Sequence, residues 1–572
     1  MRHSRLTAAV VALTNTLGVD AAQKTTSLTN AAQDLFDWSM TVNDLRFDQS
    51  YKYIRNPDKG PWSTRFTAWY VAGLLYRNNG SDHENAKAAI ENMFVQSKGS
   101  STERMSLKRT RISCQYSDAT YYDTAWYGTF KLSPDQPNPT PDSDLYPPKI
   151  YGTYDPNWRE FIGSQLVQVV EEFSSIIGDD LVNKIEDSLE IAAVGSMRRN
   201  GSFPEGDNLT PAYTNPAIMR AWYVGWIGAR RNNQTFIDYA NDQGTLIADL
   251  FFYNGSNVVS EYLSPTYYGM DVWALAGSIK YGANDAVLTT RARQMLKYFF
   301  DDLADHYNPY LTNMVGPYDR AYSRDLTTNS AVINYVWWGL YGYGAGPQSN
   351  KQEADLLYDV AQGAALALIM DTAAEHISPS TSAKLTATGP WEGSRLITKQ
   401  IYEDTTSNDE ARISTSWISS PLMIGGQVVS ETVNRGEQYV PALVQWAGDK
   451  NHTPHPYMTF FSLYPTASTI SAIAGPNTLE VSYPNTTQDG TNIFTFALAQ
   501  VPPSWTLTKR KTITGFTDLP CLNVTVDAPG LEPLPVVYGA TLERNMFYNI
   551  SYSVKDGFEG MPRIDFEFEY TC

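Results

Sequence analysis

Basic runs, long apolar runs and cysteines are all scarce in this sequence of 572 residues. It carries 43 Lys and Arg against 61 Asp and Glu, a formal net charge of −18. An acidic chain without a long Lys/Arg run has little with which to neutralise a phosphate backbone, so we expect no nucleic-acid partner. The 3 cysteines are too few for a disulfide scaffold in so long a chain. We expect Cys521 and Cys572 to pair, because they lie in the same C-terminal region, and Cys114 to be buried or free.

The N-terminal stretch has the pattern of a targeting segment. Arg2 and Arg5 precede an apolar run that is too short to span a bilayer, and small residues follow around Ala21. This pattern is typical of a cleaved secretory signal, which we place at residues 1–22. No later segment has the ~20 uninterrupted apolar residues of a membrane helix. The sequence therefore predicts a secreted, extracellular protein without a membrane partner, and nine N-x-[ST] sequons predict N-glycans.

The usual catalytic and nucleotide-binding motifs are absent. The sequence has no GxSxG, GxxxxGK[ST], HExxH or CxxC motif. These motifs identify α/β-hydrolases, P-loop proteins, zincins and dithiol redox proteins, so the sequence does not indicate any of these classes. His452 and His455 have His-x-x-His spacing, but they lie in a proline-interrupted stretch with no cysteine or carboxylate pair nearby. We expect neither a metal site nor a cofactor.

The segment from Pro61 to about Ala374 repeats a pair of helical patterns at intervals of roughly 50 to 60 residues. The first helix of each pair is apolar nearly all round, whereas the second is more charged and amphipathic. The predicted pairs span 60–96, 155–197, 215–252, 264–307 and 329–376, and a further helix is expected at 27–44. A hairpin cannot bury an all-apolar helix alone, so neighbouring hairpins must stack.

Two arrangements can stack such hairpins, an open solenoid and a closed toroid. The all-apolar first helices suit an inner ring that is covered by the amphipathic second helices. We therefore predict an α/α toroid, a complete or incomplete barrel of helical hairpins, over residues 23–380. A proline-rich stretch at 136–148 interrupts it and is expected to form an exposed loop near the rim.

The pattern changes after about Ser378. Short β-branched or aromatic runs alternate there with Gly, Pro, Asn and Asp at hairpin-like spacing. The predicted strands are 395–402, 412–420, 423–432, 439–448, 457–464, 478–483, 492–501, 505–514, 521–528 and 563–571. They indicate an antiparallel β-sandwich over residues 381–572. The fold class is therefore a multidomain α and β protein, with the toroid first and the sandwich second.

Polar and aromatic residues are concentrated in the connections that lead into the first helix of each pair. In a toroid these connections all emerge at the same end of the ring, so residues that are distant in sequence meet there. Aromatic rings cover the apolar face of a sugar while polar groups bind its hydroxyls, so we expect a carbohydrate-binding cleft. The predicted substrate-binding residues are Trp62, Arg65, Tyr154, Glu205, Asn208, Tyr213, Glu261, Tyr267, Asp271 and Arg324.

Two reactions fit such a cleft. A glycosidase needs two carboxylates across the bond that is cleaved, one of them kept protonated. Glu205 or Asp207, paired with Glu261 or Asp271, could form that pair.

A uronate lyase needs different groups. An amide and a cation must bind the carboxyl group of the sugar and stabilise the developing enolate. A tyrosine whose pKa is lowered by an adjacent arginine then removes the proton on the neighbouring carbon. The candidates are Asn215 or Asn208 for the amide, Arg320 or Arg324 for the cation, and Tyr268 or Tyr322 for the base and acid.

The stretches NLTPAYTNP, SEYLSPTYYG and GPYDRAYSRD, together with the predicted toroid and β domain, resemble fungal secreted polysaccharide lyases of the chondroitin AC, alginate and heparinase type. The resemblance in architecture covers nearly all of the chain beyond the signal. Those families place Asn, His, Tyr and Arg, with a Glu, in the cleft. In the connection after Val258, Tyr267 and Tyr268 stand where a His is expected. The resemblance therefore implies a lyase that uses tyrosine as both base and acid.

The sequence thus predicts a secreted polysaccharide lyase that cleaves a uronic-acid polymer such as glucuronan or alginate by β-elimination. Its predicted catalytic residues are Tyr268, Tyr322, Asn215 and Arg320. A glycoside hydrolase that uses the same cleft is the alternative, and a non-catalytic glycan-binding protein is the third possibility. Arginines near the cleft favour the lyase and an anionic polysaccharide, because a neutral glucan does not require them.

Overall fold

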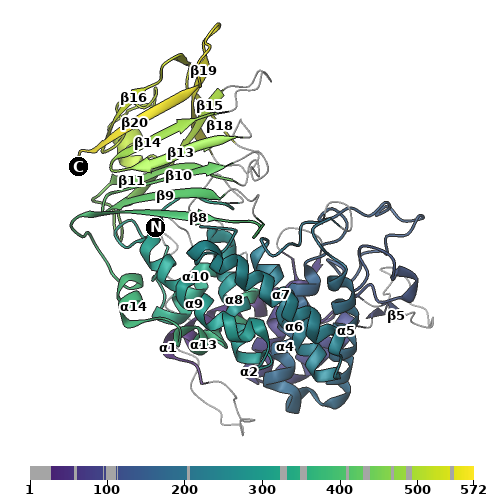
Figure 1. The fold of residues 1–572 in the computed structure, drawn as a ribbon. Helices are drawn as coiled ribbons and strands as arrows, with labels where there is room; N and C mark the ends of the chain where they lie inside the picture. Colours follow the sequence, from purple (N-terminus) through teal and green to yellow (C-terminus); the bar gives the residue numbers. More distant parts are fainter. Residues whose placement is uncertain are drawn as a thin grey trace.

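The computed structural model describes most of the chain (Figure 1). The described residues are 27–56, 61–94, 96–97, 111–112, 114–202, 207–321, 331–347, 357, 359–406, 411–429, 439–464, 469–484, 493–540 and 546–572. The predicted signal at 1–22 lies outside them. They form a helical domain followed by an antiparallel β domain, as the sequence predicts. Within these ranges, no helix combines the length and apolar character that crossing a bilayer requires.

Helical hairpins make up most of the first domain, and their bounds follow the predicted pairs. The pairs are α2 (Thr64–Arg77) with α3 (Asp82–Phe94), α4 (Trp158–Ile177) with α5 (Asp179–Met197), α6 (Thr214–Arg231) with α7 (Gln234–Phe252), and α8 (Pro265–Tyr281) with α9 (Val287–His306). Local signals fix their ends. The side chain of Ser63 accepts a hydrogen bond from the backbone N–H of Phe66 at the start of α2. Asn232 ends α6 in the left-handed conformation.

The first helix of each pair lies in the inner layer. Helices α2, α4, α6 and α8 are buried over most of their length, each contacts the next, and their partner helices pack against them. The approach of α6 and α8 is close, because a Cβ at Gly277 would lie 2.4 Å from the ring of Trp222. Glycine is therefore required at that position. The all-apolar helices are inner helices, as predicted.

The ring closes through helices from both ends of the domain. Helix α10 (Ala331–Tyr341) contacts α8, and α12 (Ala361–Ala367) contacts both α10 and α2. Helix α1 (Asn30–Arg46) packs against α10 and α12. The prediction of an outer, amphipathic helix in the second half of 329–376 is wrong for α12, whose residues are all buried. Its small residues, AQGAALA, allow it to fit between α1 and α2.

Two short helices, α13 (Met370–Ala374) and α14 (Pro379–Leu385), end the helical domain. They pack against α8 and α9. Helix α14 spans the predicted domain boundary at residue 380, and the sheet begins only at Ser394.

The segment between α3 and α4 contains the predicted proline-rich loop. Residues 136–148 form turns without helix or strand, and most of them are exposed or half-buried. Gln136 accepts a hydrogen bond from the N–H of Leu132 at 2.8 Å and donates one to the carbonyl of Thr153 at 2.6 Å. The carbonyl of Leu132 accepts from the N–H of Thr64, at the start of α2. The loop therefore lies at the end of the ring where α2 begins.

The second domain is built from one antiparallel sheet, which has thirteen strands in the described part of the chain. They are β8 (Ser394–Ile401), β9 (Arg412–Ser419), β10 (Leu422–Val429), β11 (Ala442–Asp449), β12 (Tyr457–Tyr464), β13 (Ile470–Gly475), β14 (Thr478–Ser482), β15 (Ile493–Ala499), β16 (Leu522–Asp527), β17 (Leu531–Pro533), β18 (Val537–Ala540), β19 (Met546–Val554) and β20 (Arg563–Tyr570). Their main order is β16-β20-β14-β13-β10-β11-β12-β15-β19-β17. Strand β9 pairs with β10 and β8, and β18 pairs with β19.

The sheet folds back on itself as a sandwich. The ring centroids of Phe461 on β12 and Phe566 on β20 lie 5.8 Å apart, although several strands separate β12 from β20 along the sheet. The predicted strand at 505–514 is wrong. After two prolines, Ser504–Thr508 forms a π-helical turn instead, and Trp505 packs into the core of the sandwich.

The cysteines behave as the sequence predicts. Cys521 and Cys572 form a disulfide, and Cys114 is a buried free thiol. The sulfur of Cys114 lies 3.2 Å from the hydroxyl oxygen of Tyr53. Burial raises the pKa of the Cys114 thiol to about 11. A thiol of this kind is unreactive at neutral pH, because the thiolate is the nucleophilic form.

The β domain is joined to the ring through the segment 313–321. Tyr318 and Val440 exchange backbone hydrogen bonds of 3.0 and 2.9 Å, an isolated bridge that connects this segment to the residues just before β11. Asp319 forms a buried ion pair with Arg412 of β9. The segment and the sheet are therefore packed as one unit.

Candidate active site

The connections into the inner helices meet at one end of the ring. Asn157, just before α4, donates a hydrogen bond to the hydroxyl of Tyr213, just before α6, at 3.2 Å. The backbone N–H of Thr214 donates to Glu261, in the connection into α8, at 3.2 Å. Arg320, which follows α9 in the chain, contacts Glu261 at 3.2 Å. These contacts bring together the connections that the sequence predicts to meet.

Glu261 and Arg320 form an ion pair in this region. Glu261 is 1% exposed and accepts hydrogen bonds from Nε of Arg320 and from the N–H of Thr214. Burial alone would lower the pKa of Arg320, but the charge of Glu261 and the phenol of Tyr267 raise it above its ordinary value. The guanidinium therefore stays protonated, and it lies 5.8 Å from the ring centroid of Tyr267.

Tyr213 and Tyr267 are two half-buried phenols beside Arg320. Their ring centroids lie 6.2 Å apart. Both phenols interact electrostatically with the Arg320 guanidinium. The phenol oxygen of Tyr213 also accepts the hydrogen bond from Asn157. A hydrogen-bond donor and a nearby cation both favour a phenolate, so Tyr213 has two features that a tyrosine base needs.

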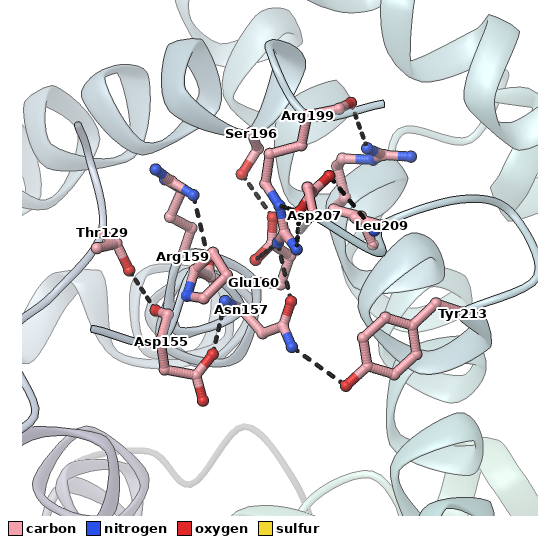
Figure 2. A network of polar contacts seen from close by, with 12 residues as sticks. Thr129, Asp155, Asn157, Arg159, Glu160, Ser196, Arg199, Asp207, Leu209 and Tyr213 are labelled. Carbon is pink, nitrogen blue, oxygen red and sulfur yellow. Dashed lines mark hydrogen bonds and ion pairs between the residues drawn. The ribbon is translucent and has the colours of Figure 1, made fainter. Parts of the chain in front are cut away.

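Asn157 is held by a buried network that reaches the outer layer (Figure 2). Figure 2 shows its amide between Arg199, which follows α5, and Tyr213. Arg199 donates to Oδ1 of Asn157 at 2.8 Å and pairs with Asp207 at 2.6 Å and Glu160 at 3.5 Å. Burial would lower the pKa of Arg199, but Glu160 and Asp207 raise it overall. Because this cation binds Oδ1 of Asn157, the Nδ2 donors are directed toward the phenols.

Asn215 and Asp271 carry unsatisfied polar atoms, and Asp271 interacts electrostatically with Glu261. Both are buried, and neither amide atom of Asn215 nor either carboxyl oxygen of Asp271 has a hydrogen-bond partner among the described residues. Burial, and then the charge of Glu261, raises the pKa of Asp271 well above its ordinary value, which favours the protonated carboxyl group. Unpaired buried polar groups cost free energy, and a bound ligand is one way to satisfy them.

Tyr268, a predicted catalytic base, lies in the core instead. Its hydroxyl accepts a hydrogen bond from the N–H of Leu263 at 2.6 Å, and its ring packs against Phe299 of α9 with centroids 4.6 Å apart. Burial raises the pKa of Tyr268 well above its ordinary value, the opposite of what a base needs. The environment of Tyr268 therefore disfavours it as the base. Successive helical residues point about 100° apart, so only Tyr267 of the adjacent pair faces the polar cluster.

Trp62 and Tyr154, two predicted substrate-binding residues, make packing contacts with other aromatic rings. The ring of Trp62 lies against Tyr51, with centroids 4.1 Å apart. Tyr154 is buried beside Trp126, with centroids 6.1 Å apart. Their contacts support a packing role.

Arg65 and Asn208 have polar or charged partners in this region. The Arg65 guanidinium is 3.9 Å from the ring centroid of Phe161 and interacts electrostatically with Asp155. Asn208 is exposed, and its Oδ1 accepts a hydrogen bond from the hydroxyl of Tyr151 at 3.0 Å. Arg65 lies in the first turn of α2, and Asn208 lies in the connection into α6.

The other predicted residues divide into two groups. Glu205, Tyr322 and Arg324 lie outside the described residues. Asp207, one candidate carboxylate of a hydrolase, is described, but it pairs with Arg199 and accepts hydrogen bonds from backbone N–H groups. Its contacts are those of a structural acceptor.

Three residues of this region are not predicted from the sequence. Asn157 and Tyr151 lie in the stretch IYGTYDPNW, where the aromatic and polar composition was the only available signal. Arg199 follows an outer helix, and no local pattern indicates that its side chain reaches the inner layer.

The fold and the site together define a class of two-domain protein. A closed helical ring packs against an antiparallel β domain, and a polar and aromatic cluster lies where the inner helices of the ring begin. The chain belongs to the family described as Domain of unknown function (DUF8769), whose model matches residues 33–371. A second family model, Domain of unknown function (DUF8770), matches residues 393–569. These spans correspond to the helical ring and the sheet. No curated protein matches the chain.

Several solved structures resemble the chain weakly. Heparinase III is 11% identical with a TM-score of 0.34, and the match covers 98% of this chain and 87% of that one. A Paenibacillus xanthan lyase is 9% identical with a TM-score of 0.37, covering 96% and 58%. The chondroitin AC lyase of Streptomyces coelicolor A3 is 8% identical with a TM-score of 0.33, covering 96% and 80%. Likenesses of this strength do not establish a reaction, so the chemistry has to be inferred from the site.

Proposed function

We propose that this protein is a polysaccharide lyase that cleaves a uronic-acid polymer by β-elimination. The observation that carries the proposal is a half-buried phenol, Tyr213, which accepts a hydrogen bond from Asn157 and lies beside the cation of Arg320. A phenol in this setting is suited to remove a weakly acidic proton from carbon. Hydrolysis of a neutral glucan requires neither the phenol nor the cation.

The carboxyl group of the bound uronate has to be stabilised as the enolate develops. Arg320 supplies a cation for this purpose. Asn215 supplies an amide whose donor and acceptor atoms have no partner among the described residues. The proposal therefore keeps both roles that the sequence predicts for Asn215 and Arg320.

Tyr213 replaces Tyr268 as the base in this proposal. The phenolate takes the proton from the carbon next to the carboxyl group, that electron pair forms the new carbon–carbon double bond, and the bond to the leaving oxygen breaks. The leaving oxygen gains a proton from the hydroxyl of Tyr213, or from Tyr267, whose ring lies 6.2 Å away. Tyr322, outside the described residues, stays an alternative base.

A glycoside hydrolase is the second candidate, and one observation favours it. Burial and the neighbouring charge of Glu261 raise the pKa of Asp271 well above its ordinary value, and pairs of carboxyl groups whose pKa values are driven apart act as acid and base in glycosidases. Hydrolysis by two carboxyl groups uses neither the phenols nor the cation of Arg320, however. The half-buried phenols beside Arg320 therefore favour the lyase.

The experiment that separates these functions uses polyuronates and neutral glucans, and follows both ultraviolet absorbance and reducing ends. A lyase produces absorbance from the new conjugated double bond together with reducing ends. Reducing ends without absorbance indicate hydrolysis. Binding without either signal indicates a glycan-binding protein.

The Tyr213→Phe variant tests the base. Removing the hydroxyl should lower kcat on the cleaved polyuronate about 10²–10⁴-fold, the usual contribution of general acid–base catalysis. Tyr343→Phe is the matched control, because Tyr343 is an exposed phenol beyond the C-terminal end of α10, at the other end of the ring. Wild-type kcat in Tyr213→Phe would remove this assignment.

We also propose that the protein is secreted and carries N-glycans. Several of its sequons are exposed, as attachment of a glycan requires. The exposed sequon residues away from the proposed site are Asn79, Asn200, Asn254, Asn451 and Asn523. After expression in a eukaryotic host, treatment of the secreted protein with an N-glycosidase should lower its mass. An unchanged mass would contradict this proposal.

A further inference from the structure

Tyr151 presents its ring to solvent close to the proposed catalytic residues. Tyr151 is 48% exposed. Its backbone has a φ of 59°, in the left-handed region that non-glycine residues rarely adopt. Its N–H donates to the carbonyl of Tyr154 at 2.7 Å, and the N–H of Thr153 donates to the carbonyl of Lys149 at 2.9 Å. These bonds close the turn and hold the strained conformation. Strain that is held in this way is concentrated at ligand-binding and active sites.

The hydroxyl of Tyr151 is fixed by two amides. It donates to Oδ1 of Asn208 at 3.0 Å and accepts from Nδ2 of Asn157 at 3.2 Å. The same nitrogen of Asn157 donates to the hydroxyl of Tyr213 at 3.2 Å. The two phenol oxygens therefore lie within 3.2 Å of one nitrogen atom. The polar end of Tyr151 is bound to protein, while much of its apolar ring is exposed.

We propose that the ring of Tyr151 is a stacking platform for one sugar unit of the polymer, in the subsite next to the one where Tyr213 acts. This inference rests on the proposed function. A pyranose presents a face of C–H groups that an exposed aromatic ring can cover. Because Asn157 and Asn208 hold the ring before binding, little conformational entropy is lost when the sugar stacks. Since Asn157 also contacts Tyr213, the platform and the base keep a fixed separation.

The test compares Tyr151→Ala with Tyr343→Ala on the polyuronate that the wild-type enzyme cleaves. Tyr343 is 59% exposed and lies beyond the C-terminal end of α10, so its loss controls for removal of an exposed tyrosine. Loss of the Tyr151 ring should raise KM about tenfold, the scale of one aromatic contact, with kcat within about twofold of wild type. Tyr343→Ala should leave both parameters unchanged.

A second variant and a binding measurement keep the inference testable if Tyr151→Ala folds poorly. Tyr151→Leu keeps an apolar side chain without an aromatic face and should raise KM to a similar extent. In the Tyr213→Phe background, which is expected to bind without turnover, Tyr151→Leu should weaken the Kd for the polyuronate about tenfold.

The outcomes separate the platform from the function on which it rests. Wild-type KM and Kd in the Tyr151 variants, with cleavage by the wild-type enzyme intact, would overturn the platform and leave the lyase in place. A wild-type protein that neither cleaves nor binds any polyuronate would contradict the proposed function itself, before any variant is compared.

Discussion

Replacing Asp271 by asparagine should stabilise the protein at neutral pH. The carboxyl group of Asp271 is 0% exposed, and neither of its oxygens has a hydrogen-bond partner among the described residues. Burial first, and the charge of Glu261 second, raises its pKa well above the ordinary value. The folded protein therefore binds a proton that the unfolded chain releases near pH 4.

The sign and size of the effect follow from proton linkage. Between the unfolded pKa, about 3.9, and the raised folded pKa, the folded state binds one more proton than the unfolded state, so stability falls as pH rises. Asparagine is neutral at every pH and has nearly the same shape. The free energy of unfolding of Asp271→Asn relative to wild type should therefore grow by about 1.4 kcal/mol per pH unit above pH 4, until the folded pKa is reached.

The assay is urea unfolding from pH 4.5 to 7.5, followed by far-ultraviolet circular dichroism, which reports mainly on the helical ring. Asp319→Asn is the matched control, because Asp319 is equally buried but is paired with Arg412. Its loss removes one of the two carboxylates that pair with the buried guanidinium of Arg412 and should cost about 3 kcal/mol at neutral pH. If Asp271→Asn changes the free energy of unfolding by the same amount at both ends of the pH range, Asp271 is not held protonated and the reasoning is refuted.

Three further changes test other parts of the structure. Asn157→Asp replaces the donor to the phenol of the proposed base by a carboxylate, which disfavours the phenolate, so the pH optimum of kcat should move upward; an unchanged profile would contradict the positioning role. Gly425→Ala would place a Cβ 2.0 Å from the carbonyl carbon of Gly316, so it should separate the sheet from the ring and sensitise their junction to proteases, whereas wild-type resistance would refute the close packing. Cys572→Ser removes the disulfide to Cys521 and should lower the free energy of unfolding of the β domain, measured in urea, by about 2–4 kcal/mol. The reduced wild-type protein should be as stable as this variant, and a variant as stable as the oxidised wild-type protein would contradict the prediction.

Much of the helical ring could be predicted from periodicity, because an all-apolar helix can only be an inner helix. The prediction failed at α12. Its seven residues are too few to show a face, and its alanines and glycine are equally compatible with an inner or an outer position. The strand predicted at 505–514 failed for a related reason. Its alternating pattern is that of a strand, but the two prolines before it start a turn instead.

The sequence predicts where the connections meet better than it predicts which side chains face the site. That the connections would meet followed from ring topology. Ring topology does not predict which of Tyr267 and Tyr268 faces the site, because both lie in the first turn of the same helix. Only the packing of Tyr268 against Phe299 shows that Tyr268 is the buried one. Arg199 and Asn157 could not be identified because their roles depend on contacts between residues far apart in the chain.

The backbone bridge between Tyr318 and Val440 and the ion pair of Asp319 with Arg412 make the β domain a structural support for the segment 313–321. Asp319 is clamped by Arg412, and the next residue in the chain is Arg320, the proposed substrate-binding cation. An enzyme truncated after its helices would keep that arginine but lose the clamp beside it. The two halves should therefore be inherited and engineered together, and a chimaera that exchanges sheets between relatives would have to transfer the arginine of β9 along with the segment that it holds.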